Sequence, residues 1–153
     1  MTGGTFEDGT MKVKQLSVFL ENKSGRMAAV TRALADHNLN LRAFSIADTE
    51  DYGILRAIVN DPDEALRVLK ADGFTASLTD VIAVEVPDAP GGLATALETL
   101  QAAGVNIEYL YAFCEKCNAN ALVVLRVENI DAATRALAVA GINVLPSQDV
   151  YSL

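Results

Sequence analysis

Cys114 and Cys117 form a C-x2-C pair, a spacing that is associated with metal binding and with redox chemistry. Such a pair can ligate zinc or cycle between dithiol and disulfide. A tetrahedral zinc site needs two further ligands, yet the chain has only these 2 cysteines and 1 histidine, His37. The pair also falls in a predicted hairpin loop rather than at a helix start. We therefore expect loop thiols without a metal or redox role, and no cofactor.

A catalytic constellation is not evident in the sequence. His37 ends a predicted helix between Asp36 and Asn38, where a polar side chain commonly contacts the last helical carbonyl groups. No serine-histidine-acid set, phosphate-binding loop or metal-binding motif is found. The sequence thus predicts a protein that is not an enzyme.

Two glycine-containing segments could bind a small zwitterion, because each leads from a predicted strand into a predicted helix. They are Glu21-Asn22-Lys23-Ser24-Gly25-Arg26-Met27 and Pro87-Asp88-Ala89-Pro90-Gly91-Gly92-Leu93. Unpaired N–H groups and the positive end of the helix dipole favour a carboxylate at such a start, and glycine lets a ligand approach the backbone. Asn22, Asp88 or loop carbonyls could accept hydrogen bonds from an ammonium group. Together these features are suited to an α-amino acid.

Asn40 and Asn106 precede the second predicted strand of each half. We expect them to lie beside the helix start, because the crossover returns this strand near the first one, and each amide could bind a ligand. Another interpretation is open: Gly25 and Gly91 could be turn glycines only, and the two asparagines could satisfy turn backbone by local hydrogen bonds.

The chain repeats itself. A shift of 66 residues places Gly25-Arg26-Met27 on Gly91-Gly92-Leu93, and also Leu34 on Leu100 and Asn40 on Asn106. Further along the chain, a shift of 68 residues is needed to place Gly73 on Gly141, so the second copy carries two extra residues. We expect this insertion in the loop around residues 114–118, since insertions belong in loops.

Each copy has the pattern of strand, helix, strand, strand, helix, strand. Predicted strands cover residues 16–20, 41–47, 53–59 and 75–78, and then 82–86, 107–113, 121–127 and 143–151. The first helices begin at Met27 and Leu93 and end at His37-Asn38 and Gly104. The second helices are predicted to start at the caps Asp61 and Asp131 and to stop at Gly73 and Gly141.

This order predicts an α+β protein of two tandem ferredoxin-like βαββαβ units with antiparallel sheets. The expected organisation is a disordered extension over residues 1–11, a first unit over 12–79 and a second over 80–153. Only residues 79–81 separate the two copies, so we expect one rigid body. Units of about 70 residues with one uncovered sheet face also predict pairing within the chain and a homodimer.

Composition excludes several classes of partner. The net charge of -8 and the pI near 4.5 oppose binding to nucleic acid or to an anionic membrane surface. No apolar run approaches the ~20 residues that cross a bilayer, and the first residues lack a secretory signal. A cytoplasmic location is therefore expected.

The two segments, followed by Leu39-Asn40-Leu41 and Val105-Asn106-Ile107, resemble the ACT domain over residues ~12 to 153. The resemblance implies amino-acid binding where two ACT units meet, with contacts from the strand-to-helix loop and the start of the second strand. Carried over by position, the ligand-binding residues would be Asn22, Gly25, Arg26, Met27, Asn40, Leu41, Asp88, Gly91, Gly92, Leu93, Asn106 and Ile107. Ser24 departs from the family pattern, in which proline is frequent at that position.

The sequence therefore predicts a non-catalytic regulatory protein that senses a small amino acid or a related metabolite at ACT-unit interfaces. The alternative is a ligand-independent regulatory subunit or interaction module for an amino-acid biosynthetic enzyme.

Overall fold

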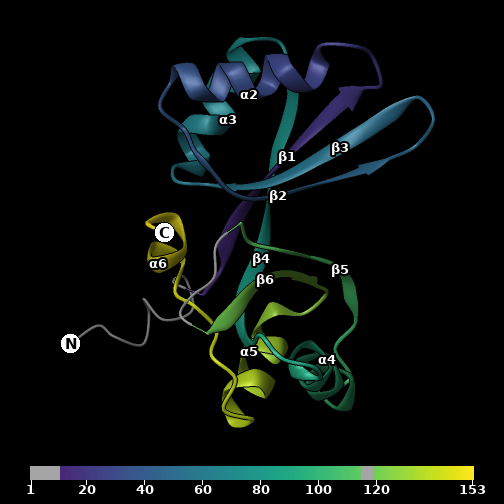
Figure 1. Cartoon of the computed structure of the whole chain (residues 1–153), viewed down its shortest axis with the longest axis vertical. Helices are drawn as coiled ribbons and strands as arrows, with labels where there is room; N and C mark the ends of the chain where they lie inside the picture. Colours follow the sequence, from purple (N-terminus) through teal and green to yellow (C-terminus); the bar gives the residue numbers. More distant parts are fainter. Residues whose placement is uncertain (1–10, 115–118) are drawn as a thin grey trace. The chain divides into compact units, whose positions relative to one another are not determined.

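A computed structural model describes residues 11–114 and 119–153 of the chain (Figure 1). Residues 1–10 of the predicted extension and most of the predicted inserted loop, with Cys117, lie outside these described residues. Met11, the last residue of that extension, packs partly against the core of the C-terminal unit, so the prediction of disorder is wrong there. Two compact units are distinguished: the N-terminal unit, Lys14–Thr79 with Tyr151–Leu153, and the C-terminal unit, Asp80–Val150 with the residues up to Val13.

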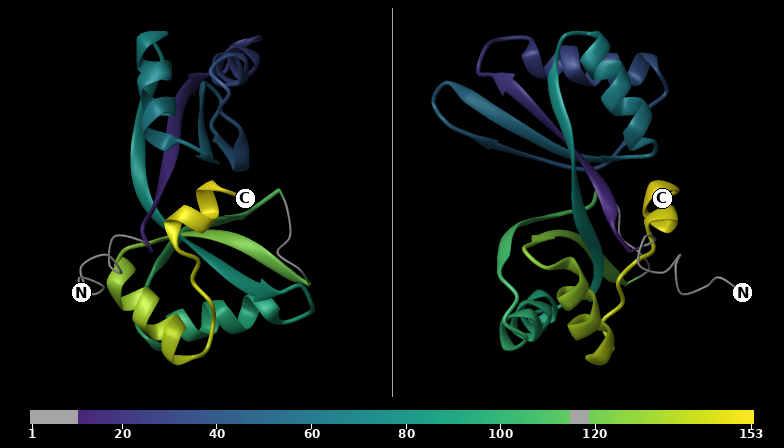
Figure 2. Two further views of the ribbon diagram at one scale, coloured as in Figure 1. Left: turned by 90° about the vertical axis from the view of Figure 1, so that its left-hand side faces the viewer. Right: turned by 180° about the vertical axis from the view of Figure 1, so that it is seen from behind.

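The N-terminal unit contains an antiparallel sheet covered by two helices on one face. Its elements are β1 (Val13–Glu21), α2 (Arg26–Asp36), β2 (Leu41–Asp48), β3 (Tyr52–Val59), α3 (Pro62–Ala71) and the first residues of β4 (Thr75–Pro87). The strand order is β2-β3-β1-β4, with Val18 opposite Leu55 and Leu55 opposite Ile46. Figure 2 shows α2 and α3 on the same face of this sheet.

The C-terminal unit repeats this arrangement. After the remainder of β4 come α4 (Gly92–Ala102), β5 (Ile107–Ala112), β6 (Asn120–Val127), α5 (Ile130–Val139) and α6 (Ser147–Tyr151). β4 pairs with β6 and β6 with β5, both antiparallel. The fourth position of the sheet is a short antiparallel bridge between Val144 and Val84. The predicted fold class, two βαββαβ units with antiparallel sheets, is thus confirmed.

The two strands predicted over residues 75–78 and 82–86 form one continuous strand, β4. Its first residues belong to the N-terminal unit and the rest to the C-terminal unit. The intervening residues Thr79, Asp80 and Val81 contain no glycine or proline that would break a strand.

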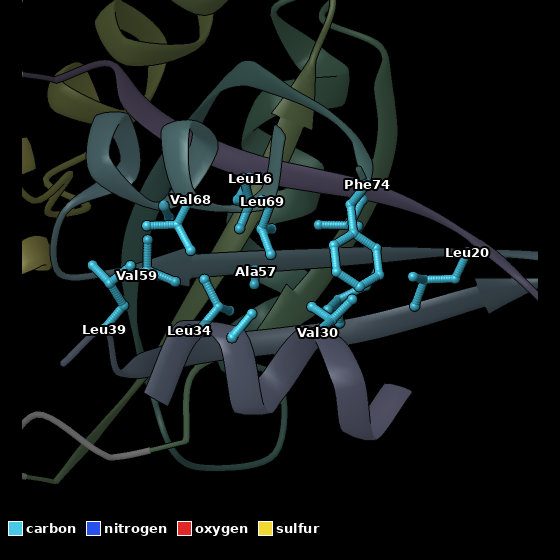
Figure 3. Close-up of a cluster of buried hydrophobic side chains, with 14 residues drawn as sticks. Leu16, Leu20, Val30, Leu34, Leu39, Ala57, Val59, Val68, Leu69 and Phe74 are labelled. Atoms are coloured by element: carbon cyan, nitrogen blue, oxygen red, sulfur yellow. The ribbon is translucent and has the colours of Figure 1, made fainter. Parts of the chain in front are cut away.

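Alternation along the strands directs one side chain in two into the core of each unit. In the N-terminal unit, Leu16, Val18 and Leu20 pack with Val30 and Leu34 of α2 (Figure 3). Val68 and Leu69 of α3 complete this core. The second core is built from the matching positions, among them Ile82, Val84, Leu100, Leu125 and Leu137.

One of the two predicted N-caps of the second helices is confirmed and the other is wrong. Asp61 caps α3 by accepting a hydrogen bond from the Glu64 N–H at 3.2 Å, with Pro62 at the first helical position. The prediction that Asp131 caps α5 is wrong. Asn129 is the cap, accepting from the Ala132 N–H at 3.0 Å. The helix begins at Ile130, so Asp131 already lies inside its first turn.

The predicted last strand over residues 143–151 is also largely wrong. Only the segment around Val144 pairs, through a Leu145 N–H to Ala83 carbonyl bond of 2.9 Å. Pro146 follows, which has no N–H to donate to a ladder. Its carbonyl accepts from the N–H groups of Asp149 and Val150, and the chain turns into α6.

Candidate functional site

Both strand-to-helix turns place a left-handed glycine at the N-cap of a helix. Gly25 has φ 87° before α2, and Gly91 has φ 89° before α4. A residue with a side chain rarely adopts this conformation, which explains glycine at both positions. Neither helix has a side-chain cap. The first backbone N–H groups therefore have no side-chain oxygen in front of them.

The hydrogen bonds at the start of each helix are the same in both units. The first N–H of each helix closes its own turn: Arg26 donates to the Lys23 carbonyl at 3.3 Å, and Gly92 donates to the Ala89 carbonyl at 3.0 Å. Intrahelical bonding then begins with Ala29 to Gly25 and Thr95 to Gly91. Between these lie the N–H groups of Met27, Ala28, Leu93 and Ala94, for which an α-helix supplies no acceptor. These four amides are the groups that a ligand carboxylate would use.

Asn22 ties the first turn to the neighbouring hairpin. Its side-chain amide donates to the Glu50 carbonyl at 3.0 Å, and its backbone N–H donates to the Asp51 carbonyl at 2.8 Å. At the matching position Asp88 donates its backbone N–H to the Ala119 carbonyl at 3.4 Å. The side chain of Asn22 thus links the first turn to the hairpin through its amide N–H.

The expectation that Asn40 and Asn106 lie beside the helix starts is wrong. Along β3, Tyr52 lies opposite Glu21 near the start of α2, whereas Val59 lies opposite Leu41. These ends of one strand are about 23 Å apart at ~3.3 Å per residue. The crossover helix carries the chain back along the sheet before β2 begins, so Asn40 lies at the far end of its unit.

At that far end both asparagines make local hydrogen bonds. The Asn40 N–H donates to Asn60 Oδ1 at 2.9 Å, and Asn106 Nδ2 donates to Glu128 Oε1 at 3.1 Å. Within one unit they cannot share a small ligand with the glycine turn. The following residues, Leu41 and Ile107, pack partly against the cores of their units.

The first helical residues differ between the units. Arg26 places its guanidinium carbon 4.7 Å from the centre of the Phe74 ring, a cation–π contact. Its Nε is buried and has no hydrogen-bond partner among the described residues. Met27 is 40% exposed. In the C-terminal unit Gly92 is buried, and Leu93 packs partly against the core.

A lysine also influences the first turn. Lys23 Nζ lies 3.0 Å from Glu21 Oε2, and this hydrogen bond, with the lysine charge, lowers the pKa of Glu21 below its usual value. Glu21 is therefore ionised at neutral pH, which places a negative charge as well as a positive one near Gly25.

A cavity of about 320 Å³ opens beside the second turn, wholly within the C-terminal unit. It is lined by Glu85, Val86, Pro87, Gly92, Thr95, Asn120, Gly141, Ile142 and Asn143. Of the predicted site residues only Gly92 lines it. Glu85 was not predicted as a site residue, although a carboxylate in the otherwise apolar run over residues 82–86 was a signal for it. Nothing in the local sequence indicates that Asn120 and Asn143 would meet there.

Two of the remaining candidates, Cys114 and His37, lie in the described residues. Cys114 is exposed and not in a disulfide. Within residues 11–114 and 119–153, no group of three or more His, Cys, Asp and Glu side chains could hold a metal ion. The ring of His37 contacts the Ala33 carbonyl at 3.0 Å from Nδ1, as expected for a helix end. In the same ranges no helix is long and apolar enough to cross a membrane.

A family model, the ACT domain pair, matches residues 11–153. The chain belongs to this family. The family assignment rests on nearly the full length of the chain and agrees with the two glycine turns and the repeated fold described above.

Solved structures agree with this assignment. Protein BT0572 from Bacteroides thetaiotaomicron is 47% identical, with a TM-score of 0.88 over 94% of this chain and 98% of that one. The regulatory subunit of aspartate kinase from Thermus thermophilus, in a ligand-free form, is 22% identical, with a TM-score of 0.64 over 85% and 93%. The corresponding subunit from Thermus flavus is 21% identical, with a TM-score of 0.60 over 86% and 94%. The two Thermus proteins share the fold. A comparison with curated proteins found no match.

Proposed function

We propose that this ACT domain pair is a non-catalytic regulatory protein of the cytoplasm that binds a small amino acid or a related metabolite. Binding would favour one arrangement of the protein over another and so change its affinity for a partner. The ligand carboxylate would occupy the open amides at the start of α2, of α4 or of both.

The observation that carries the proposal is the recurrence of an uncapped helix start behind a left-handed glycine in both units. A single glycine turn is a weak signal. Here the φ angles agree within 2°, at 87° and 89°, and the hydrogen bonds at the helix starts match although most side chains in the two segments differ. Backbone amides at a helix start, with the positive end of the helix dipole, are suited to an anionic group.

A second candidate is an interaction module that acts without a ligand, as a homodimer or bound to an amino-acid biosynthetic enzyme. The edge strand β2 favours it, because two large apolar side chains there are exposed: Phe44 at 51% and Ile46 at 44%. Apolar side chains on an unpaired sheet edge commonly mark a contact with another chain. Sedimentation analysis tests the homodimer, and a strict monomer at high concentration would exclude it.

Thermal unfolding in the presence of each of the twenty common amino acids tests the sensor proposal. A ligand that binds only the folded state stabilises it by about 2.7 kcal/mol at one hundred times its Kd, so Tm rises with ligand concentration. At least one amino acid should raise Tm in this saturable way. A protein that copurifies with an enzyme and responds to none of the twenty would support the interaction module instead.

Two proline variants can locate the site. Ala28→Pro and Ala94→Pro each delete one open amide in the first helical turn, where proline is tolerated because no internal hydrogen bond is lost. Ala28→Ser and Ala94→Ser are matched controls that keep the N–H. The proline variant in the binding unit should lose the Tm response while its serine control retains it. Equal responses in all four variants would contradict binding at these amides.

A further inference from the structure

Glu85 lies at the centre of a polar cluster in the lining of the cavity of the C-terminal unit. Asn120 Nδ2 donates to its Oε2 at 2.5 Å, and Asn143 Nδ2 donates to its Oε1 at 3.0 Å. These three residues, all lining the cavity, are called the Glu85 cluster below. The two amides hold the carboxylate in one orientation, since each carboxylate oxygen has its own donor.

The salt bridges within residues 11–114 and 119–153 do not include Glu85. An ionised carboxylate has about four lone-pair sites, and the two asparagines use two of them. A negative charge with acceptor capacity left over therefore faces a cavity that is open to a ligand.

The other polar groups of the cluster are acceptors as well. Asn120 and Asn143 direct their N–H groups to Glu85, which leaves each Oδ1 without a donor from the described residues. Pro87, also in the lining, contributes no N–H. Thr95 donates its hydroxyl to the Gly91 carbonyl at 3.0 Å. A ligand suited to these groups brings a positive charge and several N–H donors.

Gly92, in the lining of this cavity, packs closely against the end of β4. A Cβ built on it would lie 2.1 Å from the Pro87 carbonyl oxygen, so no side chain fits there without moving the backbone. The matching position in the N-terminal unit carries Arg26, whose long side chain lies over Phe74. The first helical residue therefore carries no side chain in the C-terminal unit and a long one in the N-terminal unit.

The fold itself does not require a polar cluster at this place. Strand register and the repeat match the cluster to three residues of the N-terminal unit: Phe19 for Glu85, Tyr52 for Asn120 and Thr75 for Asn143. There Phe19 and Tyr52 stack, with ring centres 4.9 Å apart. The same backbone positions carry an aromatic pair in one unit and a carboxylate with two hydrogen-bond donors in the other. The carboxylate therefore needs an explanation other than folding.

We propose that the Glu85 cluster binds a primary ammonium group, one per chain, within the C-terminal unit. The ammonium would donate to Glu85 and to the free amide oxygens, forming charge-assisted hydrogen bonds. Two sources share this chemistry, an amino acid and an amine without a carboxylate. The site does not rest on the proposed function, because it requires no contact with the open amides of the helix starts.

Three compounds that share one unbranched alkyl chain test this site. L-norleucine carries both an ammonium and a carboxylate, n-pentylamine carries only the ammonium, and hexanoate carries only the carboxylate. Their binding is followed by calorimetry and by the side-chain amide signals of Asn120 and Asn143 in 1H–15N NMR spectra. Glu85→Gln keeps the shape of the side chain and removes its charge. Glu98→Gln, on the exposed face of α4, is the matched control.

We expect n-pentylamine, L-norleucine or both to shift the two amide signals saturably, and hexanoate to leave them unchanged. Binding of both amines would show that the ammonium suffices, whereas binding of L-norleucine alone would identify amino acids as the source. Glu85→Gln should weaken binding about tenfold or more, the loss typical of a charged hydrogen bond, and Glu98→Gln should not.

Three results would overturn the inference: hexanoate shifting the signals as L-norleucine does, Glu85→Gln binding as tightly as the unchanged protein, or no response to either amine at tens of millimolar. A shift of the same signals by magnesium chloride at equal concentration would also overturn it, in favour of a metal-ion site. Each of these results leaves the thermal unfolding test of the open helix amides unaffected.

Discussion

Gly91 and Gly92 are neighbours in one turn, yet they lack side chains for different physical reasons. Gly91 has φ 89°, and nothing lies within 4 Å of a Cβ built on it, so its constraint is the backbone angle alone. Gly92 is helical, and a Cβ there would meet the Pro87 carbonyl. From the sequence alone both are predicted to be turn glycines. The sequence does not distinguish a positive φ angle from a close approach of two backbone segments.

Gly92→Ala should therefore destabilise the protein. In an ordinary helical position this change stabilises by roughly 0.5–1 kcal/mol, because glycine has more conformational freedom to lose. Here the methyl group must displace the Pro87 backbone, and overpacking of this kind costs about 1–3 kcal/mol. Chemical denaturation measures the difference. An increase in the free energy of unfolding would contradict the close approach.

Glu64 offers a prediction about pH. Arg67 donates to both of its carboxylate oxygens, from Nε at 2.5 Å and from Nη2 at 2.9 Å, and these bonds lower the pKa of Glu64. A lowered pKa in the folded state means that the pair stabilises the fold above the unfolded pKa, and that this contribution is lost as pH falls through the folded pKa.

Arg67→Gln should raise the pKa of Glu64 back toward its usual value of 4.5. Carboxyl 13C NMR titration of both proteins gives this pKa directly. An identical Glu64 titration in the two proteins would show that the bidentate pair does not form in solution.

At the scale of elements, the sequence is informative wherever a local rule decides the structure. Gly73 and Gly141 end α3 and α5 with φ 86° and 77°, as their positions predict, and Asp61-Pro62 marks the start of α3. The rule is ambiguous where two polar residues compete for one role. Asn129 and Asp131 are both good caps, and only the register of Ile130 in the helix selects the first.

Other errors have a tertiary origin. The join of two predicted strands into β4 and the placement of Asn40 depend on how strands align in space, which sequence periodicity does not contain. The Glu85 cluster draws its members from β4, β6 and the segment before Val144, so only the folded sheet brings them together. Glu85 was visible in the sequence as a charge in an apolar run, but its partners were not.

The choice between the two caps of α5 is testable. Asn129→Ala should lower the free energy of unfolding by about 1 kcal/mol, because it removes the acceptor of the Ala132 N–H. Asp131→Ala should cost only a few tenths at high salt, where its interaction with the helix dipole is screened. The two variants are compared by denaturation in the same buffer. A larger loss for Asp131→Ala would reverse the assignment.

At the scale of the whole molecule, the same fold occurs twice with different side chains around the strand-to-helix turn. Backbone features recur in both units: the left-handed glycine, the uncapped helix and the paired hairpin. Side chains around the turn do not recur. The N-terminal unit has aromatic residues and Arg26 there, whereas the C-terminal unit has Glu85, two asparagines and Gly92. The carboxylate-binding geometry proposed above belongs to the repeated backbone, whereas the side chains beside it differ between the two units.

The proposed ligand binding depends most on the open amides at the two helix starts. A 1H–15N NMR titration of the full chain with the amino acid that raises Tm most tests them directly. We predict that the backbone signals of Met27 and Ala28, of Leu93 and Ala94, or of both pairs move downfield and saturate as a carboxylate accepts their hydrogen bonds. Saturable binding that leaves all four of these signals in place would contradict the account.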